Sequence, residues 1–144
     1  KKMLIRCSKH IGTSFLEIYQ NCNIFNDGVF NHLTDKKTKY DNTIFLEHDK
    51  PLIFGKNYNK GILLDGLEPK IVSLEETTYS IQDLWIHNEK DRTKANILAR
   101  FSDKNDFPYP FGVLFNEIIP CYDQLFEEKY KSNNENYTFD GFIL

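Results

Sequence analysis

The stretch TSFLEIYQNCNIFNDGVF, residues 13–30, joins a short apolar run to a loop rich in Asn, Asp and Gly. Residues 14–20 combine Phe, Leu, Ile and Tyr, which predicts a buried strand. Residues 21–28 carry side chains suited to hydrogen bonds with the local backbone, which predicts a loop. Cys22 lies in this loop, directly after the predicted strand. Because α/β folds place their sites at strand ends, the loop is a candidate site.

Short helices and strands are predicted on both sides of this stretch. The spacing of apolar residues indicates helices at residues 1–10, 29–34, 91–101 and 120–131. Short apolar runs indicate strands at residues 43–47, 51–54, 62–64, 70–74 and 111–115, with connecting loops at 35–42, 55–61 and 105–110. Trp85 and the Phe and Tyr residues are expected in the core. This mixture favours an α/β or α+β fold over a helical bundle or a sandwich.

Length and charge limit the classes of function. The chain has 144 residues, with 18 Lys and Arg against 21 Asp and Glu, for a net charge of −3. The absence of a basic block gives no electrostatic footprint for nucleic acid. No apolar run approaches the roughly 18 residues of a membrane span, and no signal-peptide pattern opens the chain. Three widely spaced cysteines make a disulfide scaffold improbable, so a reducing, cytoplasmic setting is expected.

The chain holds no self-contained catalytic motif: GxGxxG, GxxxxGK[ST], HExxH, GxSxG and CxxC are all missing. Cys7, Cys22 and Cys121 lie 15 and 99 residues apart, so no pair has local metal-ligand spacing. A free cysteine is most often a small buried hydrophobe. Backbone amides and Asn side chains around Cys22 could instead donate hydrogen bonds to a cluster sulfur, although a single cysteine cannot hold a cluster. A thiol buried in the core would favour packing, and an exposed thiol would favour the cluster.

Five stretches, in order, resemble one family. TSFLEIYQNCNIFNDGVF (13–30) resembles part of the thiamin-diphosphate-binding β subunit of 2-oxoacid:ferredoxin oxidoreductases. TIFLEHDKPLIFGK (43–56) and KGILLDGLEPKIVSL (60–74) resemble its middle-to-late region, and residues 79–101 and 107–125 its C-terminal part. The resemblance covers about residues 5–130. The stretch QNCNIFNDG favours the 2-oxoglutarate branch of this family, and the related pyruvate enzymes remain the alternative.

The resemblance implies a fold, a reaction and partners. The fold is the C-terminal portion of a thiamin-diphosphate-binding α/β fold, with a largely parallel sheet, flanking helices and a C-terminal extension. Residues 1–144 would form a single partial domain with a loose tail at 132–144. The reaction is the oxidative decarboxylation of a 2-oxoacid to acyl-CoA, with thiamin diphosphate, Mg²⁺ and a [4Fe-4S] cluster as cofactors. The implied partners are the α subunit, ferredoxin, the 2-oxoacid and coenzyme A, with no nucleic acid and no membrane.

Two residues carry over from the family pattern. Cys22 matches the fourth cluster ligand, and Asn26 matches an Asn near the cofactor, whereas Cys7 and Cys121 match no ligand position. The other three cluster cysteines and the GDG…N segment for Mg²⁺ and the diphosphate have no counterpart here. This pattern, with the single Met at position 3, predicts a C-terminal half that is inactive alone and poorly soluble. A non-catalytic module that docks the α subunit or ferredoxin is the alternative, although the acidic balance gives it little support.

Overall fold

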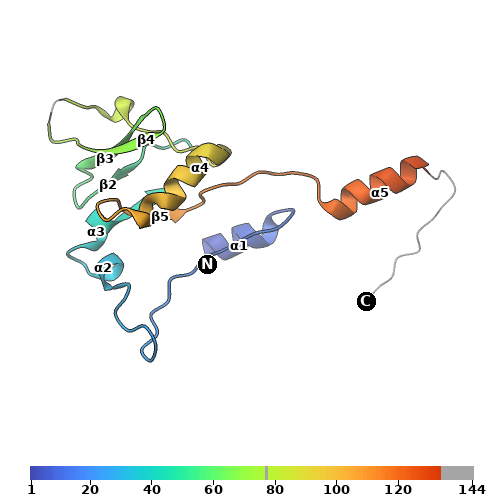
Figure 1. Cartoon of the computed structure of the whole chain (residues 1–144), viewed down its shortest axis with the longest axis horizontal. Coiled ribbons are helices and arrows are strands. Elements are labelled where there is room, and N and C mark those ends of the chain that lie inside the picture. Colours follow the sequence, from blue (N-terminus) through green and yellow to red (C-terminus); the bar gives the residue numbers. More distant parts are fainter. Residues whose placement is uncertain (77, 134–144) are drawn as a thin grey trace. The chain divides into compact units, whose positions relative to one another are not determined.

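The computed structural model describes residues 1–76 and 78–133 (Figure 1). The chain divides into two compact units, one of Lys1–Leu16 with the chain from Ile118 onward, the other of Glu17–Glu117. The single partial domain predicted over residues 1–144 stays a prediction. Of the predicted loose tail at 132–144, residues 134–144 lie outside the described residues, and 132–133 belong to a helix. Within the described part of the chain, no helix has the length and apolar character needed to cross a bilayer.

The first unit holds two helices, α1 (Lys2–Lys9) and α5 (Tyr122–Asn133). Both were predicted. Helix α1 ends before Gly12, whose φ of +113° suits glycine. At the start of α5, the side-chain oxygen of Gln124 accepts a hydrogen bond of 3.0 Å from the backbone N–H of Cys121. This bond satisfies one of the donors that a helix N-terminus leaves free.

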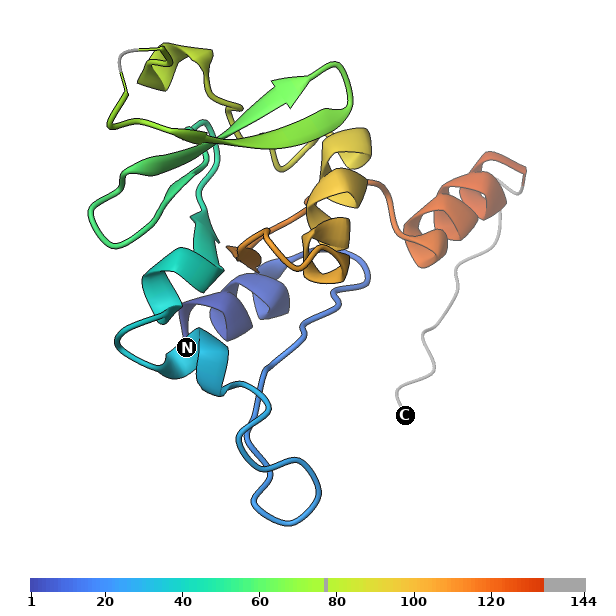
Figure 2. The ribbon, with the colours of Figure 1, turned by 60° about the vertical axis from the view of Figure 1, so that its left-hand side comes forward.

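The second unit contains two small sheets. β1 (Thr43–Leu46) pairs in parallel with β5 (Tyr109–Gly112), and β2 (Ile53–Phe54), β3 (Lys60–Asp65) and β4 (Glu68–Ser73) form an antiparallel sheet. The β3–β4 hairpin is plain in Figure 2. Helices and a parallel pair confirm the α/β class, while the larger sheet is antiparallel. The three-stranded sheet is antiparallel because short turns join β2, β3 and β4, whereas parallel neighbours need a long crossover connection.

The crossover from β1 to β5 contains α4 (Arg92–Ala99), as predicted. Asp91 caps this helix, because its Oδ1 accepts a hydrogen bond of 3.0 Å from the backbone N–H of Lys94. Strand β5 begins two residues earlier than predicted and includes Pro110, which a two-stranded sheet tolerates because both of its strands are edges. The remaining helical turns are α2 (Asn31–Thr34), α3 (Lys39–Asn42), η1 (Ile81–Asp83) and η2 (Arg100–Asp103).

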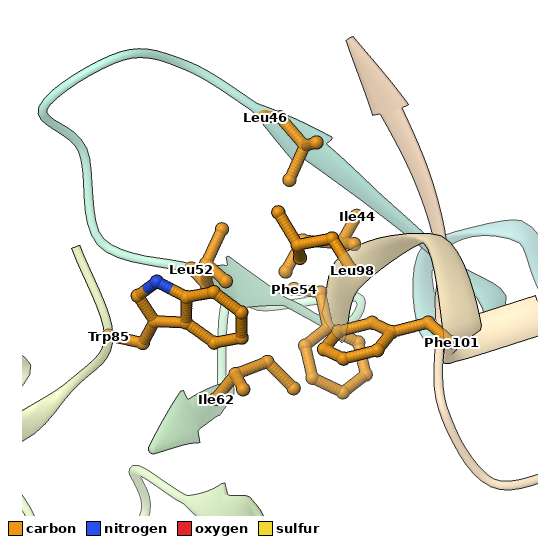
Figure 3. Packing of buried hydrophobic residues seen from close by; sticks show 8 residues of the cluster. All are labelled: Ile44, Leu46, Leu52, Phe54, Ile62, Trp85, Leu98 and Phe101. Carbon is orange, nitrogen blue, oxygen red and sulfur yellow. The ribbon is translucent and has the colours of Figure 1, made fainter. Parts of the chain in front are cut away.

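The core lies between the two sheets and α4 (Figure 3). Strands, the segment after η1 and the α4–η2 helices all contribute to it. Its members are Ile44, Leu46, Leu52, Phe54, Ile62, Trp85, Leu98 and Phe101. Leu98 and Phe101 are fully buried, which confirms the apolar face predicted for residues 91–101. Ile44 and Leu46 place β1 in this core, and the alternation along the strand directs Phe45 to the opposite face.

The predicted strand at residues 14–20 is wrong. The segment has neither helix nor strand, and Phe15 and Ile18 are 90% and 67% exposed. Among the described residues, no backbone hydrogen bond joins residues 11–21 to another backbone group. Its composition gives strand propensity, but a strand forms only when a neighbour satisfies its backbone groups. The described chain supplies no such neighbour.

Candidate functional site

The loop at residues 21–28 is held closed by the side chain of Asn21. Its Nδ2 donates hydrogen bonds to Oδ1 of Asn23 at 2.8 Å and to Oδ1 of Asp27 at 2.9 Å. Its Oδ1 accepts a bond of 2.9 Å from the backbone N–H of Gly28, which has a φ of +77°. This use of an Asn side chain to replace backbone bonds is typical of tight turns. The predicted loop is therefore confirmed.

Inside this loop, the backbone folds around Cys22. The N–H of Asn26 donates a hydrogen bond of 2.9 Å to the carbonyl of Cys22, in an isolated bridge between the two residues. Hydrogen bonds from the backbone N–H groups of Phe25 and Ile24 lower the pKa of the Cys22 thiol; a smaller one from Asn26 adds to them, and partial removal from water opposes them. Donors around a sulfur stabilise its anionic form. The loop is thus built to favour a thiolate at Cys22.

Cys22 lies outside the core. Cys22 is half-buried and does not belong to the core cluster. The nearby Ile24 and Phe25 are 83% and 89% exposed. Asn26, which forms this bridge with Cys22, is an exposed residue. The structure therefore brings the backbone of Cys22 and that of Asn26 together and presents both residues at the surface of a loop.

The other two cysteines belong to the first unit. Cys7 lies in α1, Cys121 lies just before α5, and both are free thiols. In the described ranges, no three His, Cys, Asp or Glu side chains gather in a way that could hold a metal ion. Among the described residues, Cys22 therefore has no set of neighbouring side chains with which to bind a metal.

An aromatic groove lies beside this loop, with a volume of about 420 Å³. Its wall includes the stacked rings of Tyr19 and Phe30, whose centroids are 4.9 Å apart. Phe111 of β5 meets Tyr19 edge to face at 5.5 Å, and Asn21 connects the groove to the Cys22 loop. Burial, and secondarily the Glu17 carboxylate, raise the pKa of the Tyr19 hydroxyl.

Sequence reasoning missed the groove because aromatic residues were expected in the core. Trp85 is buried as predicted, but Phe45 is 72% exposed on β1 and faces the groove. The available signal was strand alternation, since Phe45 lies between the buried Ile44 and Leu46 and must point to the opposite face. Apolar side chains on both faces of a strand are typical of a sheet that other elements cover on both sides.

Comparison with known proteins gives one curated relative. The chain is 28% identical over 124 residues to 2-oxoglutarate oxidoreductase subunit KorB of Mycobacterium tuberculosis. The alignment covers 85% of this chain and 32% of that subunit, so the chain spans about a third of the length of its relative. No protein-family model and no solved structure matches the chain.

Proposed function

We propose that this chain, a relative of the β subunit of 2-oxoacid:ferredoxin oxidoreductases, forms part of such a subunit and supplies one ligand to its iron–sulfur cluster. The ligand is Cys22, in the loop that follows residues 14–20. The other three thiolates of a [4Fe-4S] cluster would come from polypeptide that matches the rest of the relative. Asn26 is proposed to lie near the cofactor.

The observation that supports this proposal most is the position of Cys22 outside the core, in a closed loop whose backbone N–H groups lower the pKa of its thiol. An iron ligand must be a thiolate, and the N–H groups of Phe25 and Ile24 favour that form. Hydrogen bonds to cluster sulfurs also help set the reduction potential. A cluster bound at Cys22 would transfer single electrons toward ferredoxin. This chain's contribution would be to hold one iron and to stabilise negative charge on its sulfur.

The substrate belongs to the same proposal. By similarity to the mycobacterial subunit, the proposed substrate is 2-oxoglutarate, and pyruvate is the alternative. The 2-oxoacid would lose carbon dioxide, its remaining acyl group would form a thioester with coenzyme A, and the two electrons released would pass to ferredoxin. The family's GDG…N segment for Mg²⁺ and thiamin diphosphate has no counterpart among the 144 residues. We therefore assign no thiamin-dependent step to this chain. The α subunit and ferredoxin are its proposed partners.

The test is cluster content in the assembled oxidoreductase. Cys22→Ser should lower iron and acid-labile sulfide and remove or alter the electron paramagnetic resonance signal of the reduced cluster. Cys7→Ser is the matched control, because it removes an equally free thiol from α1, at a position that matches no ligand. Equal iron, sulfide and spectra in both variants would refute the assignment of Cys22.

The same proposal predicts that the chain alone is inactive. One thiolate cannot retain a cluster, so the isolated chain should give no 2-oxoglutarate-dependent reduction of a viologen dye. The assay includes thiamin diphosphate, Mg²⁺ and coenzyme A, with the assembled enzyme as the positive control. Dye reduction by the isolated chain above the rate without substrate would contradict this prediction.

A non-catalytic docking module is the second candidate, and α5 favours it. Tyr122, Phe126 and Tyr130 stack along one face of this helix, with ring centroids 6.0 and 5.7 Å apart. These rings are 81%, 50% and 40% exposed, and an exposed aromatic stripe is typical of an interface. If docking were the chain's only role, Phe126→Ala would weaken capture of the α subunit, while Cys22→Ser would change neither capture nor cluster content.

A further inference from the structure

The loop at residues 21–28 keeps its shape without apolar packing of its own. No residue in this range belongs to the core cluster, and Ile24 and Phe25 in its middle are largely exposed. A loop that buries no apolar side chain depends on hydrogen bonds for a defined conformation. The bonds that hold this loop therefore also decide where the Cys22 sulfur lies.

The side chain of Asn21 connects both ends of the loop. Its Nδ2 donates to Oδ1 of Asn23 at 2.8 Å and to Oδ1 of Asp27 at 2.9 Å, and its Oδ1 accepts from the N–H of Gly28 at 2.9 Å. A backbone N–H can only donate, so it must meet the Oδ1 end of the carboxamide, which leaves Nδ2 for the carboxylate. One side chain, next to Cys22, thus uses its donor and its acceptor to close the loop.

The ends of the loop are anchored by other contacts. The carbonyl of Gly28 accepts a hydrogen bond of 2.9 Å from the first backbone N–H of α2, and α2 contains the buried Leu33. The rings of Tyr19 and Phe30, two residues outside each end, stack with centroids 4.9 Å apart. Loss of the Asn21 side chain should therefore loosen the loop while its ends stay in place.

The backbone bridge at Cys22 lies directly inside these side-chain bonds. The N–H of Asn26 donates a hydrogen bond of 2.9 Å to the carbonyl of Cys22. Asn21 and Asp27 are the next residues outward on the two sides, so the bond between their side chains extends the bridge by one step. The two N–H groups with the largest effect on the pKa of the Cys22 thiol belong to residues that the bridge encloses.

We infer that Asn21 is a positioning residue for Cys22, because its carboxamide holds the loop of residues 21–28 in the conformation that presents the Cys22 sulfur to iron. The inference rests on the proposed function. Hydrogen bonds around a metal ligand fix its orientation, and those made to a cluster sulfur help set the reduction potential. Asn21 would act through the loop and would not itself contact iron.

The first measurement follows the bridge between Cys22 and Asn26 in the free chain. Asn21→Ala removes three hydrogen bonds, none of which involves the N–H of Asn26. The exchange of this N–H with solvent deuterium, measured by nuclear magnetic resonance, should nevertheless become about fivefold faster or more, because the loop opens more often. The melting transition should stay that of the parent, since Asn21 does not belong to the core cluster.

The second measurement uses the assembled oxidoreductase and does not depend on turnover. A redox titration followed by electron paramagnetic resonance gives the midpoint potential of the cluster. Asn21→Ala should lower the iron content or move this potential to more negative values, because a loosened loop withdraws N–H donors that stabilise the reduced cluster.

Two further variants make the test specific. Asn96→Ala is the matched control, because it removes an exposed carboxamide whose Nδ2 donates to the carbonyl of Arg92 in α4. Asn21→Asp removes the donor and opposes two carboxylates, so it should resemble Asn21→Ala. Adding Asp27→Asn to it restores a carboxamide facing a carboxylate, with the polarity reversed and the parent's net charge, and should return exchange and potential toward those of the parent.

The outcomes separate this inference from the proposed function. Unchanged exchange at Asn26 in Asn21→Ala, an equal change in Asn96→Ala, or no recovery in the double variant would overturn the role of Asn21. If exchange responds to Asn21 but iron content does not respond to Cys22→Ser, the cluster assignment is refuted and the role of Asn21 in placing Cys22 stands. If iron content depends on Cys22 while Asn21→Ala changes neither exchange, iron content nor potential, the cluster assignment stands and this inference is wrong.

Discussion

At the scale of single residues, the fold changes the acidity of the Cys22 thiol. The N–H groups of Phe25 and Ile24 lower its pKa, so the folded loop holds a larger thiolate fraction near neutral pH than the unfolded chain. We therefore predict that iodoacetamide modifies Cys22 with a pH midpoint below the midpoint measured in urea. A variant with Cys7→Ser and Cys121→Ser isolates the signal, and mass spectrometry measures the rates.

The direction of the linked effect on stability follows from the same shift. Because the folded pKa lies below the unfolded one, the loop's contribution is fully present above the unfolded pKa and is lost as the pH falls through the folded value. Identical midpoints in buffer and in urea would show that the loop does not act on the sulfur. The sequence could place Cys22 in a loop, but the effect of the neighbouring N–H groups on its thiol depends on backbone angles that no residue pattern specifies.

At the scale of secondary-structure elements, Asp91 fixes the start of α4. Its carboxylate accepts a hydrogen bond from the N–H of Lys94, so Asp91→Ala should lower the free energy of unfolding by about 1 kcal/mol. Asp91→Asn is the matched control, because Asn is an equally good N-cap and should stay close to the parent. Urea unfolding followed by circular dichroism measures both. Equal destabilisation by Ala and Asn would assign the effect to charge and not to the cap.

The close approach of β5 to β1 depends on Gly112. This residue has a φ of +133°, and a Cβ there would lie 2.7 Å from the carbonyl oxygen of Leu46. Gly112→Ala should therefore lower the free energy of unfolding by about 1–3 kcal/mol. Gly66→Ala is the control, because Gly66 also has a positive φ but nothing lies within 4 Å of its Cβ position. If both variants lost the same stability, backbone conformation alone would explain the cost.

The elements also show which features the sequence could predict. Residues 91–101 contain a capping acid and an apolar face, so local signals were sufficient to predict α4. Residues 14–20 have equally clear strand composition, yet they remain unpaired, because pairing depends on a neighbour that lies elsewhere in sequence. The groove beside the Cys22 loop was missed for a related reason. It forms where Tyr19, Phe30 and Phe111 meet, which only the tertiary fold determines.

At the scale of the whole molecule, the distribution of apolar side chains predicts self-association of the isolated chain. Exposed rings and aliphatic side chains occur along the extended segment of residues 14–20, the Cys22 loop, β1 and α5, with Phe15 at 90%, Phe25 at 89%, Phe45 at 72% and Tyr122 at 81%. Separate apolar residues are normal on a protein surface, but Phe45 lies at a groove that Tyr19 and Phe111 extend. Sedimentation velocity should show species whose mass rises with concentration.

Polar substitution tests whether this association uses the exposed apolar side chains of the extended segment and of β1. Ile18→Glu and Phe45→Glu together place charge on the extended segment and on the outer face of β1, and neither side chain belongs to the core cluster. The double variant should sediment as a smaller species and keep its melting transition, because the burial of a charge at a sheet contact is costly. Lys36→Gln with Lys37→Gln, in the exposed loop before α3, lowers the net charge by the same amount and controls for the change in charge. A parent chain that is monomeric at every concentration and melts cooperatively would show that these apolar surfaces do not drive association.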